Sequence, residues 1–214
     1  REIADHTGDR DCLGVALLGL GRTRYQEGDL PSAAELLVEA RDVFEGQGSR
    51  LGAVDCLHAI GDVRRSLGQE AAAADAYRAA LTFYDRIGSS QSAHVRLSMA
   101  LACAVQAQWN EAVELLSGCL LAFAQTGERD DVGRAHAVLL VCAGGRGDWE
   151  GFDAHLVQAS ECLRETARAD RDLALCFALA VEHASLAGQT ARAHAAQRLA
   201  EEQRSLLGIA MDTT

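Results

Sequence analysis

The stretch Tyr25–Leu37, YQEGDLPSAAELL, joins two apolar segments and contains the only proline of the 214-residue chain. Gly28 lies three residues before this proline, and glycine readily adopts the left-handed conformation that ends a helix. Pro31 suits the first turn of the next helix, where its missing N–H leaves no hydrogen bond unmade. The stretch therefore predicts a tight turn between two helices.

The same joint recurs along the chain at intervals of 39–41 residues. Its first residue, the turn column, is Gly28, Gly68, Ala107, Gly147 and Gly188. Five residues further on, the first small column is Ala33, Ala73, Ala112, Phe152 and Ala193, with Phe152 as its one large member. Seven residues beyond that, the second small column is Ala40, Ala80, Cys119, Ala159 and Ala200. Small residues in phase predict helix pairs that pack at about 8 Å and stack into one continuous core.

Apolar residues at helical spacing on both sides of each joint predict ten helices. We place them at residues 11–27, 31–46, 50–67, 70–87, 91–106, 110–126, 129–145, 149–166, 170–187 and 190–207. The repeats are expected at 9–48, 49–88, 89–127, 128–168 and 169–208 of one continuous domain, followed by a disordered tail at 209–214. Residues 1–8, closed by Gly8, are interpreted as the end of a preceding repeat helix, so the chain is read as a fragment of a longer array.

Composition agrees with an all-α fold. Aromatic residues make up 5% of the chain and proline occurs once, whereas alanine, leucine, glutamate and arginine, which favour helices, are common. The net charge of −11 would repel a phosphate backbone, so direct nucleic-acid binding is not expected. No apolar run is long enough to predict membrane insertion. The seven cysteines lack C-x-x-C spacing and are interpreted as buried thiols of a cytoplasmic protein.

The sequence contains no recognisable motif for catalysis, a cofactor or a metal. The sequence GGRG at 144–147 lacks the lysine and hydroxyl of a phosphate-binding loop, and Gly19-Leu20-Gly21 follows a predicted helix rather than a strand. Cysteines and histidines are scattered along the helices, which does not indicate a zinc site. We therefore expect no enzyme activity, no cofactor and no metal. Four histidines on first helices are interpreted as solvated or packed, with a ligand or pH role left open: His58, His94, His136 and His183.

The columns resemble tetratricopeptide repeats, whose pattern has Leu-Gly in the first helix, Gly-Asp at the turn and two alanines in the second helix. The first repeat matches with Leu20-Gly21, Gly28-Asp29, Ala33 and Ala40. The second matches with Ile60-Gly61, Gly68, Ala73, Tyr77 and Ala80. The later repeats diverge, because the first-helix glycine becomes Ala100, Leu140 and Val181. The repeat is longer than the usual length of about 34 residues. This long-helix variant resembles the C-terminal sensor domains of bacterial multidomain regulators and the repeats of animal spindle-orientation adaptors.

The resemblance implies a right-handed α-solenoid of about five antiparallel helix pairs, which binds a protein or peptide on its concave inner face. By alignment with the family, that face carries Arg22, Tyr25, Asp55, His58, Asp62, Arg65, His94, Leu97, Leu101, Arg134, Val141 and Glu182. A mixed-charge region beside an apolar strip would suit an amphipathic helix or an extended peptide. The alternative is that Leu97, Leu101 and Val141 pack between neighbouring helices.

The sequence thus leads to three hypotheses about function. The first is a non-catalytic scaffold or sensor domain of a larger cytoplasmic bacterial protein in signalling or transcription regulation, which binds a protein or peptide segment in trans or from the same chain. The second is a self-association module that forms a homo-oligomer. The third is a receptor domain that senses a small molecule.

Overall fold

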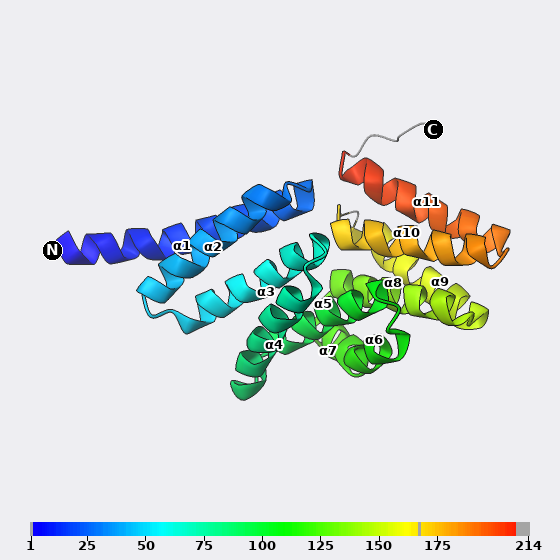
Figure 1. Cartoon of the computed structure of the whole chain (residues 1–214), viewed down its shortest axis with the longest axis horizontal. Helices are drawn as coiled ribbons and strands as arrows, with labels where there is room; N and C mark the ends of the chain where they lie inside the picture. The colour runs from blue at the N-terminus through cyan, green and yellow to red at the C-terminus, as the bar shows by residue number, and fades with distance from the viewer. Residues whose placement is uncertain (1, 167, 209–214) are drawn as a thin grey trace. The chain divides into compact units, whose positions relative to one another are not determined.

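The computed structural model describes the backbone of residues 2–166 and 168–208, and the side chains of residues 12–164 and 168–208. The described residues form eleven helices and no strand (Figure 1), which confirms the all-α class. The helices are α1 (Glu2–Glu27), α2 (Leu30–Gly46), α3 (Arg50–Ser66), α4 (Glu70–Arg86), α5 (Gln91–Val105), α6 (Trp109–Leu116), α7 (Cys119–Thr126), α8 (Arg129–Arg146), α9 (Trp149–Thr166), α10 (Arg171–Leu186) and α11 (Thr190–Leu206). The tail predicted at 209–214 lies outside the described residues.

The chain divides into two compact units, residues 1–95 and residues 96–214, and the division falls within α5. In the first unit α1 packs on α2, α2 on α3, and α3 on α4. In the second unit α8 packs on α9 and α10, α10 packs on α11, and α6 and α7 both pack on α8. Each unit is described by itself below, and the predicted five repeats of one continuous domain stay a prediction.

The turn column has the backbone conformation that the opening stretch predicts. Its five residues have positive φ angles of 85°, 69°, 59°, 71° and 70° in chain order. At the first joint, the amide of Asp29 donates to the carbonyl of Arg24 at 3.0 Å, which closes the last turn of α1. The Asp29 carboxylate then accepts a hydrogen bond from the Ser32 amide at 3.2 Å and caps α2, with Pro31 in the first turn.

The two small columns lie in the helix contacts for which they were predicted. All ten of their side chains are at most 7% exposed. The first-helix glycines of the matching repeats are also explained, because a Cβ at Gly21 would lie 2.7 Å from Leu37 Cγ. A Cβ at Gly61 would lie 2.5 Å from Tyr77 Cε1. These glycines let neighbouring helices approach closely within the first unit.

Two details of the predicted helices are wrong. The helix expected over 110–126 is divided, since α6 ends at Leu116 and α7 begins at Cys119. Gly118 lies between them at φ 85°, a conformation that glycine adopts without the steric penalty of a side chain. The helix end expected at Gly8 is absent, because α1 runs from Glu2 to Glu27. A single glycine inside a helix costs only about 1 kcal/mol, so Gly8 does not end α1.

Candidate functional site

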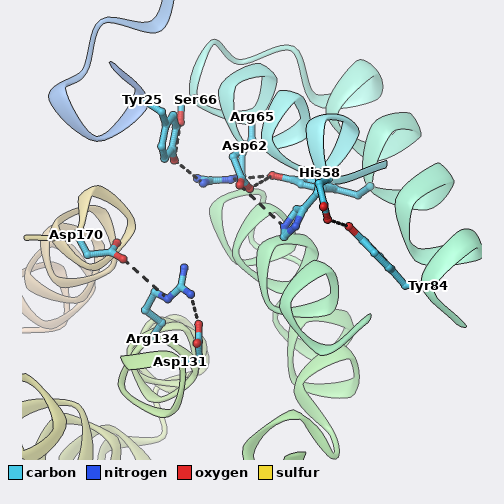
Figure 2. Close-up of polar contacts among 11 residues, drawn as sticks. Tyr25, His58, Asp62, Arg65, Ser66, Tyr84, Asp131, Arg134 and Asp170 are labelled. Atoms are coloured by element: carbon cyan, nitrogen blue, oxygen red, sulfur yellow. Dashed lines mark hydrogen bonds and ion pairs between the residues drawn. The ribbon is translucent and has the colours of Figure 1, made fainter. Parts of the chain in front are cut away.

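Arg65 of α3 is the centre of a polar network that ties together three helices of the first unit (Figure 2). Its side chain is only 8% exposed. Nη2 donates to the Tyr25 hydroxyl oxygen of α1 at 2.9 Å, and Nε donates to the Tyr77 hydroxyl oxygen of α4 at 3.3 Å. A buried guanidinium needs such partners, because an uncompensated charge is costly away from water. We call Tyr25, Asp62, Arg65, Ser66 and Tyr77 the arginine–tyrosine network.

Asp62 completes this network on the side of α4. The Tyr77 hydroxyl donates to Asp62 Oδ1 at 2.8 Å, and the Ser66 hydroxyl donates to the Tyr25 hydroxyl oxygen at 3.3 Å. Burial raises the pKa of Tyr77 well above its ordinary value, and the nearby Asp62 carboxylate raises it further. Tyr77 therefore stays protonated and remains the donor that fixes the Asp62 carboxylate.

A second tyrosine–aspartate pair lies further along the same two helices. The fully buried Tyr84 of α4 donates its hydroxyl hydrogen to Asp55 Oδ1 of α3 (Figure 2). Burial and this hydrogen bond both raise the pKa of Tyr84 well above its ordinary value. His58 Nε2 lies 4.0 Å from Asp62 Oδ2, and its ring meets the edge of Tyr77 at 6.1 Å between centroids. Two carboxylates of α3 are thus held in place by buried tyrosines.

The structure brings together five of the predicted inner-face residues in this region, and a sixth, Arg22 of α1, is exposed beside them. The five are Tyr25, Asp55, His58, Asp62 and Arg65. Burial raises the pKa values of Cys56 and Tyr84, and Arg22 lies near enough for its charge to oppose that rise in part. Tyr25 and Arg65 are buried and hold helices together, so the groups that a partner can reach are Arg22 and the partly exposed Asp55, His58 and Asp62. Their role in binding stays a prediction.

Arg134 of α8 has a structural role in the second unit (Figure 2). It forms an ion pair with Asp131, and its Nε lies 3.9 Å from Asp170 Oδ2. Burial alone would lower the pKa of Arg134, but the carboxylates of Asp170, Asp131 and Asp172 outweigh burial and raise it. Arg134 therefore keeps its charge and links α8 to the start of α10.

Asp170 connects this ion pair to the last helix. Its Oδ1 accepts hydrogen bonds from the amides of Asp172 at 2.8 Å and Leu173 at 3.1 Å, so it caps α10. The amide of Asp170 donates to Gln203 Oε1 of α11 at 3.0 Å, and Gln203 is 1% exposed. Asp170 is thereby bonded to α10 through its side chain and to α11 through its backbone amide.

The apolar residues predicted for the inner face lie in the core instead. Leu97, Leu101 and Val141 are 5%, 3% and 0% exposed. The cavity that Leu97 and Leu101 line with residues of α8 and α10 has a volume of about 10 Å³, which is too small to admit a ligand. The second unit therefore has no open apolar strip at these residues, and they pack between helices, as the alternative interpretation held.

The two remaining predicted residues are separate cases. His94 is partly exposed on α5 in the first unit, and Glu182 is exposed on α10 in the second unit. The role of these two residues in binding stays a prediction.

That two histidines of the second unit face each other was not predicted from the sequence. Nδ1 of His136 on α8 lies 3.1 Å from Nδ1 of His155 on α9, and the ring centroids are 5.3 Å apart. Burial lowers the pKa of His136 to about 4, with the charge of His155 as a smaller cause. Burial also lowers the pKa of His155, against the opposing charge of Asp148. Both rings are thus uncharged at neutral pH. The signal in the sequence was that the two histidines lie on either side of the joint at Gly147, within about three helical turns of it, on helices predicted to be antiparallel.

The cysteines follow the sequence prediction with two exceptions. None of the seven, all of which are described, forms a disulfide, and five are buried. Cys12 is exposed and Cys103 is half-buried, so the interpretation as buried thiols is wrong for these two. Burial raises the pKa values of Cys56, Cys103 and Cys142 to about 11 each, which keeps these thiols protonated and poorly nucleophilic at neutral pH.

No described helix combines the length and the apolar character that a membrane crossing requires.

This architecture is similar to that of known repeat proteins. Residues 12–86 match the family model described as Tetratricopeptide repeat. The structure of BtubC (BKLC) from P. vanneervenii is similar, at 18% identity and a TM-score of 0.66, over 100% of this chain and 89% of that chain. The nearly identical TPR-like repeats of a Podosopora anserina protein described as a kinesin light chain are 19% identical, with a TM-score of 0.57 over 89% of this chain and 93% of that chain. A comparison with curated proteins finds no match.

At these identities the structural likeness shows the fold alone. The chain has the all-α fold of TPR-like repeat proteins, and residues 12–86 match the tetratricopeptide repeat family in sequence.

Proposed function

We propose that the chain is a non-catalytic scaffold that binds a protein or peptide segment on the inner face of its first unit. Tetratricopeptide repeats generally mediate protein–protein interaction, which supports this class of function. The observation that carries the proposal is the arginine–tyrosine network, which fixes the carboxylate of Asp62 beside His58. The Tyr84 contact fixes Asp55 in the same way, close to the exposed Arg22.

Fixed polar groups favour peptide binding for a physical reason. Association costs conformational entropy wherever side chains must be ordered, and groups that are already held in place avoid that cost. The face presents one arginine with two aspartates and a histidine, so a segment of mixed charge matches it better than a polyanion or a polycation. An extended peptide or one face of a helix would be long enough to contact α1 and α3 together.

The repeat length is the basis for a proposal about the kind of protein that contains this domain. Repeats of about 40 residues with long helices resemble those of bacterial multidomain regulators. A cytoplasmic signalling or transcription-regulatory protein would use such a domain to hold a partner in trans, or another segment of its own chain.

The binding face is tested by selecting peptides from a random library on the whole chain and mapping the bound peptide by NMR. We expect the amide resonances of Arg22, His58 and Asp62 to shift in proportion to occupancy, while those around the exposed Arg78 of α4 stay in place. Arg78 is a suitable reference because its side chain is 66% exposed and forms a surface ion pair with Asp75. Shifts confined to residues outside α1 and α3 would contradict the proposed face.

Self-association is a second candidate, supported by an exposed groove on α1 and α2. The groove has a volume of about 830 Å³, and its apolar lining includes Leu13, at 44% exposed, and Val38, at 37% exposed. If a second copy covers this groove, the chain is a dimer by light scattering and Val38→Glu is a monomer. Leu186→Glu, at an 80% exposed position in the second unit, is the matched control and should leave the mass unchanged. A parent chain that is monomeric at high concentration excludes this candidate.

A further inference from the structure

The facing histidines of α8 and α9 are a partly buried polar contact of the second unit that none of the proposed functions uses. His136 and His155 come from the two helices of one antiparallel pair, and their Nδ1 atoms lie 3.1 Å apart. The ring centroids are 5.3 Å apart, so the two nitrogens point toward each other rather than away into solvent. Such an approach requires a species between the nitrogens: either a hydrogen that one ring donates to the other, or a cation that accepts a lone pair from both.

The separation fits a metal ion that bridges the two rings. Imidazole nitrogens bind zinc at about 2.0–2.1 Å, and in tetrahedral geometry two such ligands lie about 3.3–3.4 Å apart. The observed 3.1 Å is shorter than this by a few tenths of an ångström, so each ring would have to rotate slightly to admit the ion. Imidazole is a preferred ligand of zinc, copper and nickel ions.

The helices on either side of the histidines are held close together, so the two rings are preorganised. A Cβ at Gly133 of α8 would lie 2.9 Å from the Cβ of Cys162 on α9. A Cβ at Gly144, further along α8, would lie 3.3 Å from the Phe152 ring on α9. His136 and His155 fall between these two close contacts, and the separation of the helices is therefore fixed on both sides of the pair.

We propose that His136 and His155 form a two-imidazole site for a divalent cation of the zinc, copper and nickel group. Among the described residues, no third side-chain ligand atom of the Cys, His, Asp or Glu type lies within 4.8 Å of both nitrogens. Water fills the remaining coordination positions. The cation joins α8 to α9 and stabilises the second unit, because binding to the folded state alone adds to the free energy of unfolding.

Cation binding moves one ring hydrogen of the pair but releases none. In the metal-free pair one ring is the Nδ1–H tautomer and donates, while the other accepts at Nδ1 and carries its hydrogen on Nε2. When the cation binds both Nδ1 atoms, the first ring moves its hydrogen from Nδ1 to Nε2. Each ring then keeps one hydrogen, so the two neutral rings release no proton.

The test is titration of the whole reduced chain with zinc chloride by calorimetry. Cys12 is replaced by serine in every sample, because this exposed thiol is also able to bind zinc. We expect one equivalent of Zn²⁺ to bind the parent, and His136→Gln and His155→Gln each to weaken the affinity by about tenfold or more. His194→Gln is the matched control, since His194 is exposed on α11, and it should bind as the parent does.

A second measurement keeps the proposal falsifiable if a variant folds poorly. In the parent, zinc should shift the Nδ1 resonances of His136 and His155 and leave both rings as Nε2–H tautomers. The proposal is overturned if the parent shows no saturable binding, if both glutamine variants bind zinc as the parent does, or if zinc leaves both Nδ1 resonances unchanged. In the last case the pair holds only a shared hydrogen.

Discussion

At the scale of single residues, the turn column shows how closely local backbone conformation governs the sequence. Four of its five members are glycine, and all five have positive φ. Ala107 is the exception, and it is the one residue other than glycine with a positive φ in the described part of the chain. A left-handed conformation costs a residue with a Cβ about 1–2 kcal/mol. The third joint is therefore the strained copy of the turn.

Replacement of this alanine should stabilise the protein. Ala107→Gly removes the steric cost of the left-handed conformation, while glycine loses about 0.4–1 kcal/mol of extra chain entropy on folding. We expect a net gain of about 0.5–1 kcal/mol in the free energy of unfolding, measured by urea denaturation. Gly147→Ala, the same exchange in reverse at φ 71°, should destabilise the protein by a similar amount. Equal stability of Ala107→Gly and the parent would mean that the third joint is not strained.

Arg65 is the residue on which the first unit depends most strongly. Arg65→Ala leaves the Tyr25 and Tyr77 hydroxyls without the guanidinium that they share, and it removes the cation that lies with the Asp62 carboxylate near Tyr77. Loss of one partner from a buried, charged network costs about 3–5 kcal/mol. Arg65→Lys should restore only part of this, because an ammonium cannot reproduce the planar set of donors.

The control for this prediction is a surface arginine of the same unit. Arg78→Ala breaks an exposed ion pair with Asp75 and should change the unfolding free energy by less than about 1 kcal/mol. Chemical denaturation followed by circular dichroism compares the three variants. An Arg65→Ala loss no larger than that of Arg78→Ala would show that the network contributes little.

At the scale of elements, most helices could be predicted from the columns because their causes are local. Turn residues, the proline and the small residues act within one joint, so one sequence shows them. The break between α6 and α7 could not be predicted in this way, since Ser117-Gly118 is also compatible with a continuous helix. Burial of Leu97, Leu101 and Val141 depends on which helices cover them, and their spacing does not reveal that.

The contact between α6 and α10 gives a pH prediction. The His183 ring of α10 lies perpendicular to the Trp109 ring of α6, with 5.2 Å between centroids. Burial lowers the pKa of His183, against the opposing charge of Glu182. The folded protein therefore takes up this proton less readily than the unfolded chain does, whose histidines titrate near 6.5.

The sign of the effect follows from proton linkage. Below about pH 6.5 the unfolded chain binds more protons than the folded protein, so the stability that is present above this pH declines as the pH falls. We expect the unfolding free energy to fall more between pH 7 and pH 5 in the parent than in His183→Gln, measured by urea denaturation. His194→Gln, at an exposed position, should follow the parent. Parallel pH profiles of the parent and His183→Gln would contradict the prediction.

At the scale of the whole molecule, the sequence predicts the architecture far better than the site. The repeat period predicted helix pairs, and the structure has them in each unit. The inner face was predicted by alignment with a family, and that alignment does not separate residues that hold helices together from residues that meet a partner. Tyr25, Arg65 and Arg134 proved to be of the first kind, whereas Arg22 is exposed. The histidine pair depends on the register between α8 and α9, to within one helical turn.

The central claim is that the inner face of the first unit binds a peptide, and Arg22 tests it with the least structural damage. Charge reversal of Asp55 or Asp62 would also break the contacts to Tyr84 and Tyr77, whereas Arg22 is exposed and is not part of the arginine–tyrosine network. The decisive measurement is the affinity of a library-selected, fluorescently labelled peptide for the parent, Arg22→Glu and Arg78→Glu, by anisotropy. The account predicts binding about tenfold weaker or more for Arg22→Glu, equivalent to about 1.4 kcal/mol, and unchanged binding for Arg78→Glu. Equal affinity of Arg22→Glu and the parent would contradict it.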